Sequence, residues 1–282
     1  MKRILVPVDF SEESSYALDF AIEFNERIKG EIVLLHVIEI PHHSFNTEGE
    51  TDWKHTQEYL EGQWIKGVHN QLEKWSERVS SSGQAILIKM KQGHAYKHIS
   101  KEIAEVKASW IIQGSKGASG LKEIFLGSNA ERVIRYAECP VITIKGPAKI
   151  SEIKNMVFAS DLSEEQDWVA HKTKDVQEML GLNMHLLKVR TQYNLLTAKD
   201  AEKQLHDFAK RNYLSQYTVN SIEADYADEG IVKFSEEVGA GLIVIGTHGK
   251  TGLAHFFGGS RAEDLVNESK IPVLTFKLPF YN

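Results

Sequence analysis

The sequence has little of what marks secreted, membrane-spanning or nucleic-acid-binding proteins. Cys139 is the one cysteine among 282 residues, so no disulfide can form within the chain, which favours a reducing compartment. Acidic residues outnumber basic ones by 39 to 33, whereas nucleic-acid binding needs clustered Lys and Arg. No apolar run approaches the ~18 residues of a membrane span, and Asp9 cuts the first apolar run short of a secretory core. We therefore expect a cytoplasmic protein with no membrane span and no nucleic-acid partner.

Familiar catalytic and nucleotide-binding patterns are missing as well. Gly249-Lys250-Thr251 follows Gly246 after only two residues, which is shorter than the gap a P-loop needs. The dinucleotide-binding pattern Gly-x-Gly-x-x-Gly does not follow the first apolar run. No Ser-His-Asp or Cys-His grouping can be given a task, so we predict no catalytic residues.

A glycine pattern, in contrast, occurs twice with one spacing. Each copy has a glycine, a second glycine three positions later, and a Gly-Ser pair ten positions after that: Gly114, Gly117 and Gly127-Ser128, then Gly246, Gly249 and Gly259-Ser260. The copies lie 132 positions apart (246 minus 114). Each follows a short apolar run and precedes a helix-like stretch. Such a turn binds phosphate readily, because free N–H groups and the helix dipole point at it. The sequence therefore predicts two copies of a nucleotide-binding unit.

Apolar runs and helix-like stretches alternate along each half. The expected strands cover residues 4–8, 31–37, 84–90 and 108–112 in the first half, and 155–161, 183–189, 217–224 and 241–245 in the second. Ser11 and Ser163 are placed to open the helix after the first strand of each half. This alternation predicts open, doubly wound parallel sheets with ligands at the carboxyl ends of the strands. Asp9 and Asp161 lie at that end, where each can face one crevice with the glycines.

These repeats predict two domains, residues 1–147 and 152–278, joined through Gly146-Pro147-Ala148-Lys149. The aspartates after the first strands are 152 positions apart (161 minus 9), against 132 for the glycines. The first half therefore holds 20 extra residues, expected as an insertion at about 41–64.

The insertion is rich in His and Trp. Its His42, His43, His55 and Glu58 lack the spacing of a metal site, so we predict no metal bound by the protein there. Trp64 and the later Trp75 are expected to pack an amphipathic helix over a sheet.

Each half resembles the universal stress protein family, and the chain resembles a tandem member of its ATP-binding type. The resemblance rests on Val6-Pro7-Val8-Asp9-x-Ser11, on Leu34-Leu35-His36-Val37 and on the repeated glycine signature, and it covers nearly the whole chain. It implies two open, doubly wound five-stranded parallel-sheet domains of the adenine nucleotide alpha hydrolase-like kind, packed as an intramolecular pseudo-dimer. The strands after Pro140 and Pro272, at 141–145 and 273–277, are then expected to pair antiparallel.

The resemblance also implies site residues and a ligand, ATP with Mg²⁺ or Mn²⁺. In the first half Pro7, Val8, Asp9 and Val37 would form the adenosine end, with Asp9 accepting from ribose. Gly114 and Gly117 would line the phosphate path, and Gly127, Ser128 and Asn129 would close on the phosphates. The matching residues of the second half are Asp161, Val189, Gly246, Gly249, Gly259, Ser260 and Arg261. The implied role is regulation in a stress response, with at most slow ATP hydrolysis.

Several alternatives stay open at this point. Ala159-Ser160 stands where the first half has Pro7-Val8, so Ser160 could disrupt the adenine wall and make the two sites unequal. If Ser160 instead makes a hydrogen bond to ligand or backbone, the second site would bind just as well. Asp9 and Asp161 could instead cap the following helix. One or both domains could hold a lipid or another small metabolite, and the fold alone does not exclude a nucleotide-dependent enzyme. A homodimer of the two-domain chain is also compatible with the sequence.

Overall fold

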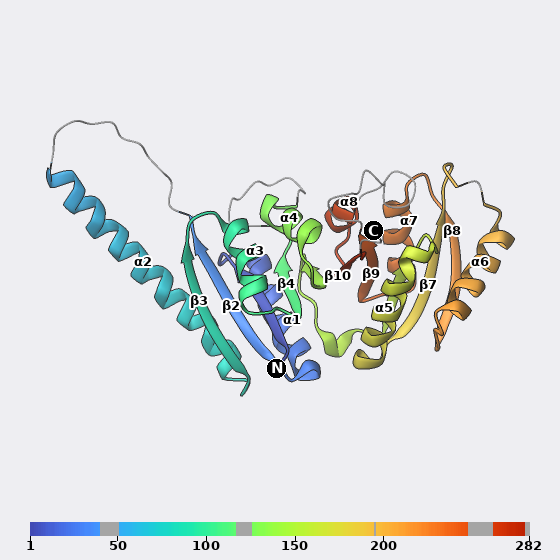
Figure 1. The fold of residues 1–282 in the computed structure, drawn as a ribbon, viewed down its shortest axis with the longest axis horizontal. Coiled ribbons are helices and arrows are strands. Elements are labelled where there is room, and N and C mark those ends of the chain that lie inside the picture. Colours follow the sequence, from blue (N-terminus) through green and yellow to red (C-terminus); the bar gives the residue numbers. More distant parts are fainter. Residues whose placement is uncertain (40–50, 117–125, 195, 248–261, 280–282) are drawn as a thin grey trace.

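The computed structural model of the chain describes residues 1–39, 51–116, 126–194, 196–247 and 262–279, without the side chains of 51–61. Within these ranges the two halves lie side by side along the longest axis of the molecule (Figure 1).

The halves repeat one order of elements. The first half holds β1 (Arg3–Val8), α1 (Glu12–Ile28), β2 (Glu31–Ile38), α2 (Thr51–Ser80), β3 (Ala85–Gln92), α3 (Ala95–Glu105), β4 (Trp110–Gly114), α4 (Ser128–Tyr136) and β5 (Val141–Ile144). The second half holds the 3-10 turn Ile150–Glu152, β6 (Asn155–Ala159), the 3-10 turn Glu164–Gln166, α5 (Asp167–Leu180), β7 (Asn183–Arg190), α6 (Ala198–Arg211), β8 (Tyr217–Glu223), α7 (Ala227–Glu237), β9 (Leu242–Thr247), α8 (Ala262–Glu268) and β10 (Val273–Lys277).

The described strands form one ten-stranded sheet in the order β3-β2-β1-β4-β5-β10-β9-β6-β7-β8. Neighbouring strands within each half run parallel, for example β1 with β2 and β4. The halves join through β5 and β10, which pair antiparallel with Leu274 opposite Ile142. The predicted fold, including the antiparallel pairing of the two last strands, is confirmed.

Helices cover both faces of this sheet, as continuous apolar strands require. Ile4, Leu5 and Val6 of β1 are fully buried. One face packs against α1, α2, α5 and α6, and the other against α3, α4, α7 and α8. The carboxyl ends of the parallel strands are thereby left as the edge where a ligand can enter.

Local signals in the sequence set the ends of α1. The Ser11 side chain accepts a hydrogen bond from the N–H of Ser14, as an N-cap does. The helix ends at Lys29, whose φ is +54°, and Gly30 follows. A Cβ at Gly30 would lie 2.4 Å from the carbonyl oxygen of Lys2, so only glycine lets the chain pass β1 this closely.

Strand ends are shifted by about two residues from the expected ones, as in β4 (expected 108–112, observed Trp110–Gly114) and β6 (expected to 161, observed to Ala159). Two larger differences concern helices. Ser163 precedes a 3-10 turn, and the α-helix α5 begins at Asp167. Trp64 was expected to pack on the sheet but is 45% exposed, whereas Trp75 packs edge-on against Phe10 with ring centroids 5.4 Å apart. The reason is the length of α2: it has 30 residues against 14 in α6, and its first half projects beyond β3 (Figure 1).

Candidate nucleotide site

A cavity of about 160 Å³ opens at the carboxyl ends of β1 and β4 in the first half. It lies where the strand order reverses, since β1 is followed along the sheet by β2 on one side and by β4 on the other. Such a switch point is where open α/β sheets bind ligands. Eight residues of the predicted site line the cavity: Pro7, Val8, Asp9, Val37, Gly114, Gly127, Ser128 and Asn129. The ninth, Gly117, lies outside the described residues.

Asp9 combines two roles at the rim of β1. One of its carboxylate oxygens accepts from the N–H of Ser11 at 3.0 Å and from the Ser11 hydroxyl at 2.5 Å. Ser11 in turn accepts from the N–H of Ser14. The carboxylate therefore supports the helix cap, as the alternative interpretation of the sequence held, while Asp9 also lines the cavity.

Glycine is required at Gly114 by the close approach of β4 to the start of α1. A Cβ there would lie 2.9 Å from the backbone carbon of Glu13 and 2.9 Å from the N of Ser14. Backbone atoms cannot swing aside as the end of a side chain can. The absence of a side chain at Gly114 therefore sets how closely the end of β4, which lines the cavity, approaches the first turn of α1.

The first turn of α4 begins at a residue that has no capping side chain. Gly127 is its N-cap residue, and a glycine has no side chain to accept a hydrogen bond from the helix. The N–H of Gly127 itself donates to the carbonyl of Ser115 at 2.8 Å. The N–H groups that open a helix without a capping side chain are suited to an anion. Lys116 also lines the cavity and adds a positive charge at this end.

Several lining residues were not predicted from the sequence. Lys116 stands inside the glycine signature, which could have drawn attention to it. Ala95 and Ile99 come from α3 and give the cavity an apolar wall together with Leu35. Only the packing of α3 over β2 brings them here, and no local pattern signals it.

His36 holds the end of β1 from the opposite face of the sheet. Its Nδ1 lies 2.8 Å from the carbonyl oxygen of Val8, to which it donates, and its ring stacks on Phe10 at 4.4 Å. Burial lowers the pKa of His36, against the opposing effect of the Val8 hydrogen bond. The strand end that carries Val8 and Asp9 is therefore fixed by a neutral imidazole near pH 7.

The second half differs at the matching positions. Lys188 replaces His36 and donates from Nζ to the carbonyl of Asp161 at 2.6 Å, and burial lowers the pKa of Lys188. Ser160 is 1% exposed and its hydroxyl accepts from the N–H of Leu162 at 3.0 Å. Ser160 therefore has a backbone partner, and it gives no reason to expect weaker binding in the second half.

Gln166 occupies space beside β9, the strand that carries Gly246. It stands 152 positions after Ser14 (166 minus 14), which lines the first-half cavity. A Cβ on Gly246 would lie 2.5 Å from the Gln166 side-chain oxygen. That oxygen is buried and has no hydrogen-bond partner among the described residues.

Three of the seven predicted residues of the second half are described. Asp161 follows β6, and its carboxylate accepts from the N–H of Ser163 at 2.9 Å. Val189 and Gly246 lie near the carboxyl ends of β7 and β9, which flank β6 in the sheet. The other four lie outside the described residues: Gly249, Gly259, Ser260 and Arg261.

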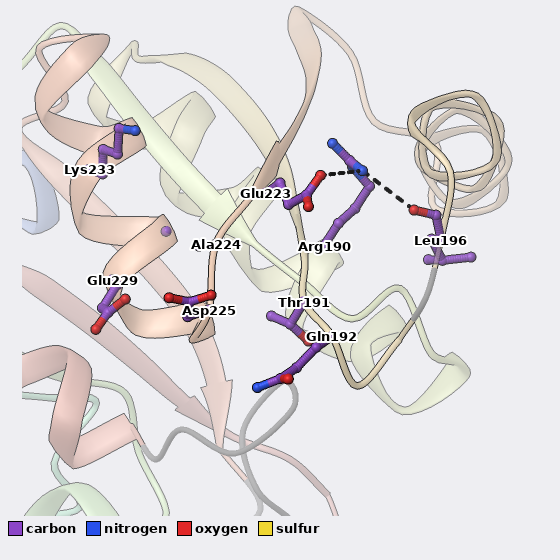
Figure 2. A pocket seen from close by; sticks show the side chains of 10 residues that line it. Arg190, Thr191, Gln192, Leu196, Glu223, Ala224, Asp225, Glu229 and Lys233 are labelled. Carbon is purple, nitrogen blue, oxygen red and sulfur yellow. Dashed lines mark hydrogen bonds and ion pairs between the residues drawn. The ribbon is translucent and has the colours of Figure 1, made fainter.

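A larger cavity, of about 710 Å³, lies further out in the second half, where β7 and β8 end and α7 begins. Its lining includes Arg190, which is paired with Glu223 at 3.1 Å. Figure 2 shows this pair across the cavity from Asp225 and Glu229, which lie together near the start of α7. Of the predicted site residues that the structure describes, none lines this cavity, although Arg190 directly follows Val189.

No group of three or more His, Cys, Asp or Glu side chains within the described ranges could hold a metal ion. The histidines and Glu58 of the insertion lie outside the described side chains. In the part of the chain that the structure describes, no helix is both long and apolar enough to cross a bilayer.

Comparison with known proteins agrees with this architecture. Residues 1–145 and 152–277 each match the sequence model of the universal stress protein family. The chain belongs to that family. A universal stress protein of Methanocaldococcus jannaschii is 33% identical over 152 residues, which cover 52% of this chain and 84% of that protein. A universal stress protein of Synechocystis is 24% identical over 301 residues, covering 98% of this chain and 100% of that protein.

Among solved structures, a universal stress protein from Archaeoglobus fulgidus has the same fold. It superposes with a TM-score of 0.72 at 22% identity and covers 98% of this chain and 96% of its own. At this identity the likeness concerns the fold, so the ligand must be argued from the site itself.

Proposed function

We propose that this universal stress protein binds an adenine nucleotide, ATP with Mg²⁺ or Mn²⁺, in its first half and acts as a regulatory protein. One observation carries the proposal: the switch-point cavity is lined by eight of the nine first-half residues that the family resemblance implies. Four separate sequence segments supply them, so their meeting does not follow from proximity along the chain.

The lining divides by chemistry into two ends. Val37, Leu35 and Ile99 provide apolar surface for an adenine ring, and the Asp9 carboxylate lies where a ribose hydroxyl can donate to it. The first turn of α4, whose N-cap residue is a glycine, and Lys116 suit phosphate. The cavity is smaller than the ~300 Å³ at which ligand pockets usually begin. The phosphates therefore extend beyond it, past the start of α4.

The metal would enter with the nucleotide. No carboxylate cluster is present among the described residues to bind it alone. Mg²⁺ usually keeps several waters and is held through substrate phosphates, which fits a site rich in N–H donors. The protein's part is then to position the phosphates that hold the ion.

The experiment is to identify what the purified protein releases on denaturation and to titrate the apoprotein with MgATP by calorimetry. We expect an adenine nucleotide in the released fraction, or saturable MgATP binding after its removal. Neither released nucleotide nor binding at millimolar MgATP would refute the proposal.

The two halves should bind unequally. In the second half Gln166 lies against Gly246, so we propose the first half as the tighter site. Gly117→Val and Gly249→Val each place a branched side chain where backbone should approach phosphate. Titrated separately, Gly117→Val should lose the tighter binding event. Equal residual affinities in the two variants would contradict this asymmetry.

The larger cavity of the second half favours a second candidate function, the binding of a small metabolite. Its lining carries Arg190, Asp225 and Lys233, so it suits a small polar molecule better than a lipid. Mass spectrometry of the released ligand separates the candidates, because this one requires a molecule other than an adenine nucleotide.

A further inference from the structure

Asn267, in the last turn of α8, contacts the segment of the first half that leads into α4. Its side-chain oxygen accepts a hydrogen bond from the backbone N–H of Leu126. Leu126 directly precedes Gly127, the N-cap residue of α4. The next N–H, that of Gly127, donates to the carbonyl of Ser115. Two consecutive N–H groups at the phosphate end are therefore held by the two different halves.

The backbone of Asn267 is held in return by the first half. The Lys145 ammonium donates to the Asn267 carbonyl. Lys145 follows the end of β5, where the carbonyl of Ile144 accepts from the N–H of Ser115 at 2.9 Å. Burial, and after it the nearby charge of Lys116, lower the pKa of Lys145. Because Lys116 lines the cavity, the cross-contact lies next to the proposed phosphate end.

A second contact between the two halves, this one between α4 and α8, serves as a comparison. Arg135 of α4 and Glu263 of α8 form an ion pair at 3.0 Å. Arg135 lies in the last turn of α4, away from the start of the helix where Gly127 and Ser128 line the cavity. This pair joins the halves without touching the segment that leads into α4.

We infer that Asn267 is a positioning residue for the first-half nucleotide site, through which the second half sets the backbone at its phosphate end. The inference rests on the proposed function. Asn267 itself does not line the cavity. It acts by fixing Leu126, and thereby the direction in which the first N–H groups of α4 point.

This arrangement predicts that loss of the Asn267 contact weakens the binding of phosphate groups and not the binding of adenosine. Val8, Asp9 and Val37 belong to β1 and β2 or directly follow them. These strands lie two and three places from the β5–β10 junction in the sheet. Loss of the Asn267 contact should therefore spare the adenosine end. A general loss of folding would weaken both ends together.

The test is Asn267→Ala in the full chain, with Glu263→Gln as the matched control. Calorimetry with MgATP and competition with adenosine give the ratio of the two affinities, and chemical denaturation gives stability. Loss of one hydrogen bond that orients the site costs about 0.6–1.4 kcal/mol in binding when it weakens affinity about three- to tenfold. We therefore expect MgATP affinity to fall about three- to tenfold in Asn267→Ala while adenosine affinity stays unchanged, and the ratio to stay unchanged in Glu263→Gln.

A second measurement needs no variant. Hydrogen exchange of the wild-type chain should show MgATP slowing exchange both at 126–136 and at 262–268. Protection confined to the first half would overturn the inference, as would an unchanged MgATP-to-adenosine ratio in Asn267→Ala. A wild-type chain that binds adenosine and MgATP with equal affinity would also overturn it. A wild-type chain that binds neither would refute the proposed function, and the inference with it.

Discussion

The substitution Gly114→Ala tests the close packing of the end of β4, which lines the cavity, against the first turn of α1. The added Cβ would lie 2.9 Å from two backbone atoms of α1, at Glu13 and Ser14. Because both are backbone atoms, either β4 or the first turn of α1 must shift. Overpacking of this kind typically costs about 1–3 kcal/mol. We expect a loss of stability in that range and a drop in MgATP affinity of about tenfold, which corresponds to ~1.4 kcal/mol.

Gly246→Ala is the matched variant in the second half. There the nearest atom to the added Cβ is the side-chain oxygen of Gln166, at 2.5 Å. A terminal amide can rotate away, although Val169 lies close behind at 3.0 Å. The destabilisation should therefore be smaller than that of Gly114→Ala, and the tighter nucleotide site should be unaffected.

Gly67→Ala in α2 controls for the effect of removing a glycine. A Cβ there meets nothing within 4 Å, so the change should stabilise the chain by up to ~1 kcal/mol through helix propensity. Urea denaturation and calorimetry with MgATP measure all three variants. Equal destabilisation by Gly114→Ala and Gly246→Ala would refute the assignment of Gly114 to a backbone contact that shapes the site.

Three further predictions concern Asp9, His36 and Cys139. Asp9→Ala should weaken MgATP, by about tenfold, but not inorganic triphosphate, because its proposed ligand partner is ribose; an equal loss for both would remove ribose as that partner. Burial lowers the pKa of His36, so the folded chain binds this proton less tightly than the unfolded one, and stability should fall as the pH drops below ~6.5 toward the folded pKa. His36→Gln should remove that part of the pH dependence in denaturation curves, and identical curves would contradict the assignment. Cys139 is half-buried, and this raises the pKa of its thiol to about 12. Alkylation at pH 8 should therefore be slow until urea unfolds the chain, and rapid labelling of the folded chain would contradict the raised pKa.

The fold could be predicted because its determinants are local and repeated. Continuous apolar runs such as Ile4–Val8 require a sheet buried on both faces, and a second copy of each run fixes the repeat. The packing of β5 against β10 was expected because two strands of this kind, each after a proline, would otherwise remain open edges. Their antiparallel pairing was implied by the family resemblance. The division at residues 147 and 152 stays a prediction.

The residues that line the first-half cavity could be predicted from motifs, but the differences at the matching positions of the second half could not. Ser160 is polar in the sequence, yet only the structure shows its backbone partner. Gln166 gives no signal in the sequence, because its effect depends on which way its side chain points. Asn267 contacts Leu126 across 141 positions, and no local pattern indicates a contact between halves. Trp64 was wrongly placed because helical periodicity predicts a face but not where the sheet beneath it ends.

A crystal structure of the full chain grown with MgATP tests directly whether the first-half cavity binds nucleotide. We predict adenine against Val37, ribose within hydrogen-bond distance of Asp9, and phosphates over the first turn of α4. Nucleotide bound in the larger cavity beside Arg190, with the cavity at β1 and β4 empty, would contradict it.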